Sequence, residues 1–243
     1  MTRFKNKVCV VTGGNSGIGR ATARQLAAEG GKVAILSRTE SEGSAVVAEI
    51  AKAGGTAIFL QTDVGSLEQV QVAVASIVKK WKRMDVLVNG AAMMTYQPIA
   101  ELAMEEWDQL MAINLRAVFL LCKLCTPHMK KGAIVNVSSV HAHETSANVM
   151  PYAASKGAME AFTRGLSQEY DSSWLRINNV APDAVDTPML WENPNVKSGK
   201  EKITGAVGRP EDIAEVICFL ASPQAAFVNG TTVVADGGRL NIL

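Results

Sequence analysis

The chain has little net charge, few cysteines and no long apolar run. Its 24 lysines and arginines nearly balance its 23 aspartates and glutamates, which leaves a formal charge of +1. A balanced chain has no overall field to attract nucleic acid or an anionic membrane, so its ligands have to be captured locally. No apolar run reaches the roughly 18 residues that a membrane span needs. The sequence therefore predicts a protein without nucleic-acid or membrane partners.

The four cysteines lie in apolar segments, and the start of the chain does not resemble a signal peptide. Both features predict a cytoplasmic location. Cys122 and Cys125 form a CxxC pair, which could serve redox or metal chemistry. The surrounding NLRAVFLLCKLCTPHM is typical of a helix and offers no second ligand pair at metal spacing, so packing in the core is the preferred interpretation. No metal site is predicted.

Internal repeats, low-complexity segments and Pro/Gly-rich linkers are also lacking. A chain of 243 residues with 48% apolar residues is too apolar for a disordered adaptor and fits one α/β domain over 1–243. Short β-branched runs alternate with segments of helical spacing, which predicts a Rossmann-like, doubly wound parallel sheet of about seven strands with helices on both faces. The strands are expected at 7–12, 32–37, 57–62, 85–90, 133–138, 175–180 and 232–235, and the helices at 18–29, 41–53, 66–82, 105–130, 152–172 and 210–221.

A glycine-rich turn, TGGNSGIG at 12–19, joins the first expected strand to the first expected helix. Glycine permits positive φ and lets a backbone approach a phosphate, while the new helix offers free N–H groups and a positive dipole end. The spacing is GxxxGxG rather than GxGxxG, so the position after the first strand carries the interpretation. The turn is predicted to hold the pyrophosphate of a dinucleotide through Gly13, Asn15, Ser16, Gly17, Ile18 and Gly19.

The end of the second expected strand, Ser37-Arg38, affects the choice between NAD and NADP. An acidic side chain about 20 residues past the glycines ordinarily binds the ribose 2′-OH of NAD, whereas a basic one can hold the 2′-phosphate of NADP. No carboxylate follows until Glu40, and Arg38 offers a bidentate fork for phosphate. NADP(H) is therefore favoured. The alternative is that Arg38 stacks on adenine and NAD(H) binds.

Tyr152 and Lys156 are four residues apart at the start of an expected helix, so both project from one face. Such a pair by itself is more often solvated surface. Its position is more informative, because Ser138-Ser139 ends an expected buried strand just upstream. Ligands of open parallel sheets bind at the carboxyl ends of the strands, so the three side chains are candidates for one site.

Together these motifs resemble the short-chain dehydrogenase/reductase family of the common 250-residue type, over essentially the whole chain. They come in the order TGGNSGIG at 12–19, Asp63-Val64, NGAA at 89–92, Asn114, Ser139, Tyr152-Ala-Ala-Ser-Lys156, Pro182 and Asp236-Gly237-Gly238. The resemblance implies an NAD(P)(H)-dependent oxidoreductase that transfers hydride between nicotinamide and a secondary alcohol or ketone. It also implies catalytic roles for Ser139, Tyr152 and Lys156, a supporting role in a proton relay for Asn114, and further cofactor contacts at Ser37, Arg38, Asp63, Val64, Asn89, Ala91, Tyr152, Lys156, Val185 and Thr187.

The chemistry explains why these side chains belong together. A free tyrosine has a pKa of about 10, but an adjacent ammonium, helped by the charge of the oxidised nicotinamide, favours the phenolate. Tyr152 can then accept a proton from an alcohol. In reduction it donates that proton to the carbonyl oxygen while Ser139 stabilises the developing oxyanion, and Lys156 is expected to hold the nicotinamide ribose as well.

Two positions depart from the family pattern. Asn89-Gly90-Ala91-Ala92 stands where the family has NNAG, and the small Gly90 and Ala92 are expected to preserve the close approach to the adenosine ribose. Pro182-Asp183 stands where the family has a Pro-Gly turn. Asp183 brings a side chain and a negative charge next to the nicotinamide, where it either influences substrate choice or turns outward.

The substrate wall is expected from 93–97, 140–150 and a lid at about 183–209, with Met94, Ser139, His141 and Tyr152 as contacts. The polar residues of 140–150 favour a sugar, a polyol or a cyclic hydroxyketone, whereas the methionines and Trp191 suggest an apolar ketone. One alternative is a 3-oxoacyl-thioester reductase, which a basic surface beside the pocket entrance would favour. Another is a non-catalytic dinucleotide sensor, since fold does not imply function, although the complete set of catalytic side chains argues against it.

The resemblance also suggests self-association. The helices at 105–130 and 152–172 are expected to pair with a second subunit, and the C-terminal GGRLNIL is expected to seal another interface. A homotetramer is the first expectation and a dimer the second. The alternative is that the apolar positions of these helices face only the sheet of their own chain.

Overall fold

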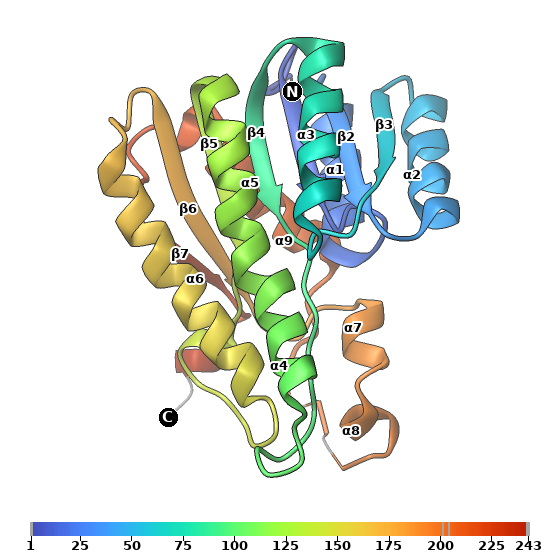
Figure 1. The fold of residues 1–243 in the computed structure, drawn as a ribbon, viewed down its shortest axis with the longest axis vertical. Coiled ribbons are helices and arrows are strands. Elements are labelled where there is room, and N and C mark those ends of the chain that lie inside the picture. The colour runs from blue at the N-terminus through green and yellow to red at the C-terminus, as the bar shows by residue number, and fades with distance from the viewer. Residues whose placement is uncertain (1, 201, 204, 242–243) are drawn as a thin grey trace.

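The computed structural model describes residues 2–200, 202–203 and 205–241, and within these ranges seven strands form one parallel sheet in the order β3-β2-β1-β4-β5-β6-β7 (Figure 1). Helices cover both faces of the sheet, so the predicted fold class is confirmed. The strands are β1 Val8–Thr12, β2 Lys32–Ser37, β3 Thr56–Gln61, β4 Met84–Asn89, β5 Met129–Val137, β6 Leu175–Pro182 and β7 Thr232–Ala235.

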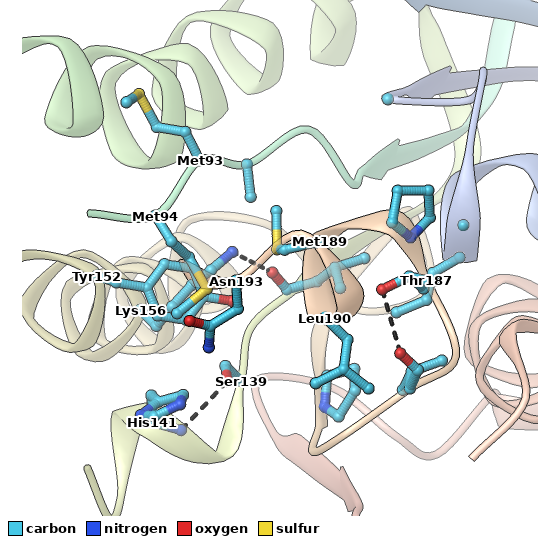
Figure 2. Close-up of a pocket in the computed structure, with 18 of the residues that line it drawn as sticks. Met93, Met94, Ser139, His141, Tyr152, Lys156, Thr187, Met189, Leu190 and Asn193 are labelled. Carbon is cyan, nitrogen blue, oxygen red and sulfur yellow. Dashed lines mark hydrogen bonds between the residues drawn. The ribbon is translucent and has the colours of Figure 1, made fainter. Parts of the chain in front are cut away.

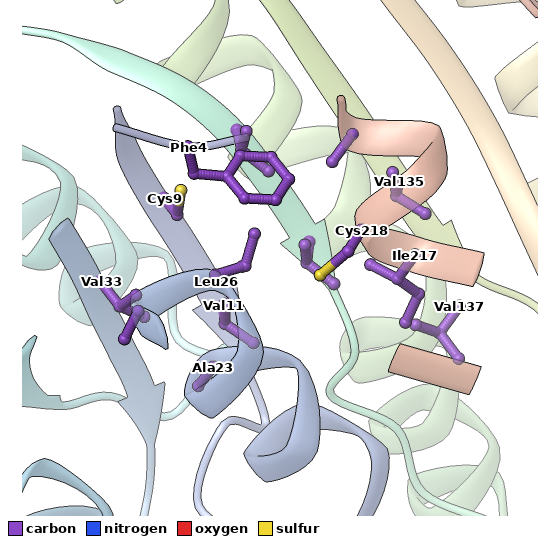
Figure 3. Close-up of a cluster of buried hydrophobic side chains, with 14 of the residues drawn as sticks. Phe4, Cys9, Val11, Ala23, Leu26, Val33, Val135, Val137, Ile217 and Cys218 are labelled. Carbon is purple, nitrogen blue, oxygen red and sulfur yellow. The ribbon is translucent and has the colours of Figure 1, made fainter. Parts of the chain in front are cut away.

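Two apolar clusters separate the sheet from its helical layers, because successive strand residues point to opposite faces. Val11 and Cys9 of β1 face α1 and α9, where Cys218 and Phe4 complete the cluster (Figure 3). Val8 and Val10 face the other layer, formed by α3, α5 and α6. The helices are α1 Gly17–Ala28, α2 Glu40–Lys52, α3 Leu67–Trp81, α4 Met104–Met111, α5 Ala117–Cys125, α6 Met150–Glu169, α7 Pro188–Trp191, α8 Pro194–Lys197 and α9 Pro210–Ala221.

The helix expected over 105–130 is shorter and less regular than the sequence indicates. A π-helical turn at 112–116 separates α4 from α5, and a 3-10 turn at 126–128 ends the helical segment. Strand β5 then begins at Met129, four residues before the expected start, because Met129 pairs with Met84 of β4. The prediction was wrong at this end, since apolar residues alone do not mark where a buried helix gives way to a buried strand.

The segment Met104–His128 also has the length and composition of a membrane span, with a mean hydropathy of 1.5 over its most apolar window. The expectation that no such segment exists was therefore too simple. In this fold 56% of that window is buried, as in the core helix of a globular protein. Cys122 and Cys125 lie buried in α5, and burial raises the pKa of both thiols, to about 12 for Cys125. This placement agrees with packing in the core.

The strand register brings the carboxyl ends of the central strands to one edge. Thr12 pairs with Asn89 across β1 and β4, and Val137 pairs with Val180 across β5 and β6. The strand order reverses direction between β1 and β4, which is the topological switch point where such folds bind ligands. The glycine-rich turn after β1 and the segment after β5 both open at this edge.

A chain of buried polar side chains joins helix α6 to the sheet. Asn89 donates to Asn136 at 2.7 Å, Asn136 donates to Thr163 at 2.8 Å, and Thr163 donates to Asn179 at 2.7 Å. Asn179 in turn donates to Thr232 of β7 at 3.0 Å. Since buried amides are costly to leave unpaired, this chain selects one position of α6 over β4, β5 and β6.

Candidate active site

A cavity of about 800 Å³ extends along the carboxyl edge of the sheet. It begins at the glycine-rich turn, passes the ends of β2, β4, β5 and β6, and reaches α7 and the C-terminal turn. Most of the residues predicted for the site line it: Gly13, Asn15, Ser16, Gly17, Ile18, Gly19, Ser37, Arg38, Asp63, Val64, Ala91, Met94, Ser139, His141, Tyr152, Lys156, Val185 and Thr187.

The glycine-rich turn has the geometry of a phosphate cradle. Gly13 has a φ of +66°, and a Cβ on Gly19 would lie 2.1 Å from the carbonyl oxygen of Gly13. Gly17, with a φ of +48°, starts α1, whose first turn contains no acidic residue. The N–H groups at the start of α1 therefore border the cavity without a side chain or a carboxylate competing for them, so the turn fits a dinucleotide pyrophosphate.

The adenosine end of the cavity contains Ser37 and Arg38. Ser37 is buried, and its Oγ has no hydrogen-bond partner among the described residues, while the side chain of Arg38 is exposed. A carboxylate lies behind the glycine-rich turn. Glu42, in the first turn of α2, accepts a hydrogen bond from Asn15 at 2.6 Å. Arg38 therefore lines the cavity directly, whereas Glu42 contacts its wall through Asn15.

The catalytic candidates converge from α6 and from the segment after β5 (Figure 2). Tyr152 and Lys156 are buried, and Lys156 Nζ donates to the carbonyl oxygen of Val137 at 2.6 Å. The same Nζ lies 5.4 Å from the ring centroid of Tyr152. Ser139 Oγ accepts a hydrogen bond from the backbone N–H of His141 at 3.2 Å, which orients it at the start of a 3-10 turn.

Burial shifts the pKa values of both Tyr152 and Lys156. Desolvation raises the pKa of Tyr152 to about 12, although the hydrogen bond with Ser139 opposes the shift. Desolvation also lowers the pKa of Lys156 to about 7. In the protein without its cofactor the apolar surroundings disfavour both charged forms, so the phenolate expected from the ammonium together with the oxidised nicotinamide is not favoured by the side chains by themselves.

Two predicted site residues do not line the cavity. Asn114 lies at the π-helical turn with no exposed surface, and its amide bonds to the N–H and carbonyl of Met93 and to Ser155 Oγ. It therefore ties the segment after β4 to α6. The side chain of Asn89 points into the sheet toward Asn136 and likewise makes no part of the cavity wall. The sequence motif did not separate side chains that line the site from side chains that support it.

The substrate side of the cavity is apolar on one wall and polar on another. Met94 lies on the same side of the cavity as Met189 and Leu190 of the lid, whereas the side chain of Met93 points away from them (Figure 2). The ring of His141 meets Tyr152 edge to face, with the ring centroids 5.7 Å apart. The lid contains the short helices α7 and α8. Its residues 201 and 204, like residues 242–243 of the expected C-terminal interface, lie outside the described residues.

Three further side chains at the cavity belong to segments that were predicted for the site, although they were not singled out by number. Asn193 is a buried residue of the lid, and Tyr96 lies close enough to Tyr152 to contribute to its raised pKa. Thr12 lies behind the wall, where its Oγ accepts hydrogen bonds from the N–H groups of Gly90 and Ala91. The motif and the predicted segments indicate where these residues lie in the chain, but the contacts that each makes depend on the packing of distant segments.

The side chain of Asp183 does not point into solvent, because it is paired within the protein. Its carboxylate accepts a hydrogen bond from Arg239 Nη1 at 3.0 Å. Arg239 belongs to the C-terminal turn, and both residues line the cavity. The charge introduced at position 183 is therefore neutralised by a residue 56 positions away in the chain.

Comparison with known proteins agrees with this geometry. Residues 13–239 match a family profile described as enoyl-(acyl carrier protein) reductase. The chain is 36% identical over 246 residues to a cyclopentanol dehydrogenase of Comamonas testosteroni, with 98% of each chain covered. It is also 36% identical over 245 residues to 3β-hydroxysteroid dehydrogenase 1 of Eggerthella lenta, with 97% of this chain and 94% of that protein covered.

Solved structures extend the similarity to the whole fold. Levodione reductase superposes with a TM-score of 0.92 at 31% identity, covering 99% of this chain and 100% of that chain. A short-chain dehydrogenase from Burkholderia cenocepacia in complex with NADP has a TM-score of 0.89 at 31% identity, covering 97% and 98%. The sheet order, the glycine cradle and the buried Tyr152 and Lys156 beside Ser139 thus agree with the similarity over the full chain: the protein belongs to the short-chain dehydrogenase/reductase family of NAD(P)-dependent oxidoreductases.

Proposed function

We propose that the protein transfers hydride between NADP(H) and a cyclic secondary alcohol or ketone that carries a polar substituent. The observation that carries this proposal is the placement of Ser139, Tyr152 and Lys156 in one cavity with the glycine-rich turn. The wall of methionines suits an apolar ring, and His141, on the other wall, suits an oxygen substituent. The names of the relatives that act on cyclopentanol and 3β-hydroxysteroids support a cyclic substrate.

The mechanism follows from the proton that Tyr152 holds. When bound, the nicotinamide cofactor supplies or accepts the hydride. In reduction, Tyr152 donates its phenolic proton to the carbonyl oxygen, and the Ser139 hydroxyl donates a hydrogen bond to the same oxygen as negative charge develops there. Lys156 holds its ammonium against the Val137 carbonyl, below the Tyr152 ring, and stabilises the phenolate that remains. Oxidation runs through the same steps in reverse.

A 3-oxoacyl-thioester reductase is the second candidate. Lys200, Lys202 and Arg239 line the cavity on its substrate side, which is the basic surface that a phosphorylated acyl carrier would require. The description of the matching family profile names an acyl carrier protein. Asp183 and Glu144 line the same side and offset part of this charge, so the cyclic substrate remains the first proposal.

We further propose that the protein acts as a homotetramer in the cytoplasm, with a dimer as the alternative assembly. The four free cysteines are buried, as is usual for thiols in a reducing compartment. A groove between α4, α5 and α6 exposes half of Phe119, whose ring meets Phe162 edge to face at 6.4 Å. Exposed aromatic rings in such a groove favour contact with a second copy of the helix pair.

Removal of the phenolic hydroxyl tests the function. Tyr152→Phe should bind NADPH as the unchanged protein does but lose at least about 10²-fold in turnover, since the proton donor is gone. Cofactor binding is measured by fluorescence titration and turnover with cyclopentanone, cyclohexanone and a 3-oxoacyl thioester. Tyr170→Phe serves as the matched control, because Tyr170 directly follows the C-terminal end of α6 and does not line the cavity. Near-normal turnover by Tyr152→Phe would refute the proposal, and turnover of the thioester alone would favour the second candidate.

The raised pKa of Tyr152 predicts different pH profiles for the two directions. With a pKa of about 12 in the protein alone, the phenol stays protonated from pH 6 to 8, so titration of Tyr152 should not change ketone reduction in that range. Any decrease there should instead follow loss of the Lys156 ammonium, whose pKa is about 7. Alcohol oxidation needs the phenolate, so its kcat/KM should increase with pH, by up to about tenfold per unit, until the pKa in the cofactor complex is passed. Initial rates in both directions check this, and a flat oxidation profile between pH 6 and 10 would contradict it.

The cofactor preference is tested at Arg38. Arg38→Ala should raise the KM for NADPH by at least about tenfold and leave the KM for NADH within about twofold, because a guanidinium–phosphate pair is lost in only one case. Glu42→Gln removes the nearby negative charge and should lower the KM for NADPH. If Arg38→Ala changes both KM values equally, Arg38 stacks on adenine and does not select the phosphate.

The assembly is tested by sedimentation equilibrium. Four chains of 25.8 kDa predict a mass of about four times that value, and Phe119→Asp should lower the mass, because a charge would be buried in the groove. Val72→Asp, at an exposed position of α3, is the control that should leave the mass unchanged. A monomeric mass for the unchanged protein would show that these apolar positions face only their own sheet.

A further inference from the structure

The ion pair between Asp183 and Arg239 connects two segments that border the substrate side of the cavity. Asp183 directly follows β6, and Arg239 follows β7. The carboxylate side chain is 12% exposed and the guanidinium side chain 45% exposed, so the pair is shielded on one side and open to the cavity on the other. An ion pair in this position holds the arginine in place and leaves part of it accessible.

The C-terminal turn that carries Arg239 is itself well anchored. Asp236 accepts hydrogen bonds from the N–H groups of Gly238 and Leu240, both at 2.8 Å, and the bond from Leu240 is the main reason that the pKa of Asp236 is lowered. Gly237 and Gly238 adopt φ values of +66° and +90°, which allow the chain to reverse directly after β7. Arg239 and Leu240 are therefore presented to the cavity by a turn of defined shape.

Arg239 retains hydrogen-bonding capacity after it pairs with Asp183. A guanidinium has five N–H donors, and within the described residues the side chain of Arg239 makes a single bond, from Nη1 to Asp183. Its Nε and Nη2 groups bond to no described protein atom. Since Asp183 already neutralises the charge, the remaining donors suit a neutral oxygen acceptor better than a second carboxylate.

The sheet places these donors at a suitable distance from the reacting centre. Ser139 follows β5, and the C-terminal turn follows β7, two strands away. Neighbouring strands lie about 4.8 Å apart, so the two strand ends are separated by about 10 Å. An arginine side chain and a six-membered ring together can bridge this interval.

From this geometry we propose that Arg239, held by Asp183, is a specificity-determining residue that donates a hydrogen bond to a second carbonyl or hydroxyl oxygen of the substrate, on the side of the ring opposite the reacting carbon. Asp183 is the positioning residue for this guanidinium. The inference rests on the proposed function and narrows its substrate to cyclic diones, hydroxyketones and diols.

Three ketones of one ring size test the proposal: cyclohexanone, cyclohexane-1,4-dione and 4-oxocyclohexanecarboxylate. The unchanged protein should have a KM for the dione at least about tenfold below that for cyclohexanone, more than the factor of about two that its two equivalent carbonyls supply. In Arg239→Met this advantage should fall to about twofold, and Arg239→Lys should restore part of it. Arg24→Met, on the exposed surface of α1 and away from the cavity, is the matched control and should leave all three KM values unchanged.

Asp183→Asn separates positioning from folding. It keeps the size of the side chain but releases Arg239 from its charged partner. The KM for the dione should therefore rise by a larger factor than its kcat falls. The kcat/KM for 4-oxocyclohexanecarboxylate should rise relative to that for the dione. An equal change for cyclohexanone and the dione in Arg239→Met would overturn the proposal while the proposed function stands. A preference of the unchanged protein for the carboxylate would overturn the assignment of a neutral oxygen. Absence of turnover with every ketone would refute the proposed function and this inference with it.

Discussion

The attachment of α6 to the sheet is the constraint on which the active site depends. The helix carries both Tyr152 and Lys156, while Ser139 and the carbonyl that accepts from Lys156 belong to β5 and the segment after it. Apolar packing alone would tolerate small shifts of a helix along a sheet, because the hydrophobic effect is not directional. The buried bonds from Asn136 to Thr163 and from Thr163 to Asn179 are directional, and a shift of the helix would leave them unmade.

The same burial that orders Tyr152 and Lys156 also determines their electrostatics. Lys156 is 1% exposed and Tyr152 is 6% exposed, and this burial lowers the pKa of Lys156 and raises the pKa of Tyr152 in the protein alone. A cation arriving beside the Tyr152 ring would favour the phenolate, as would protonation of Lys156. The site is thus arranged so that proton transfer responds to what occupies the cavity rather than to the side chains by themselves.

Charge in this protein is balanced overall and organised locally. The chain carries a formal charge of +1, yet the cavity has free N–H groups of α1 and the Arg38 side chain at one end, and a set of basic residues at the other. On the substrate side Asp183 neutralises Arg239, so the guanidinium becomes a directional hydrogen-bond donor rather than a general attractor of anions. At position 183, where the family pattern has a glycine, Asp183 pairs with Arg239 near the C-terminus.

The sequence by itself predicted the fold class and the phosphate-binding turn, because hydrophobic periodicity and a glycine-rich turn are local signals with direct structural causes. The catalytic candidates and most of the other cofactor contacts followed from the order and spacing of motifs that resemble a known family. The sequence did not determine the boundary between α5 and β5, where both elements are buried and apolar, or the inward orientation of the Asn89 and Asn114 side chains. Nor did it indicate the pair of Asp183 and Arg239 or the raised pKa of Tyr152. Contacts between residues far apart in the chain and the degree of burial decide these features, and only the tertiary structure specifies either one.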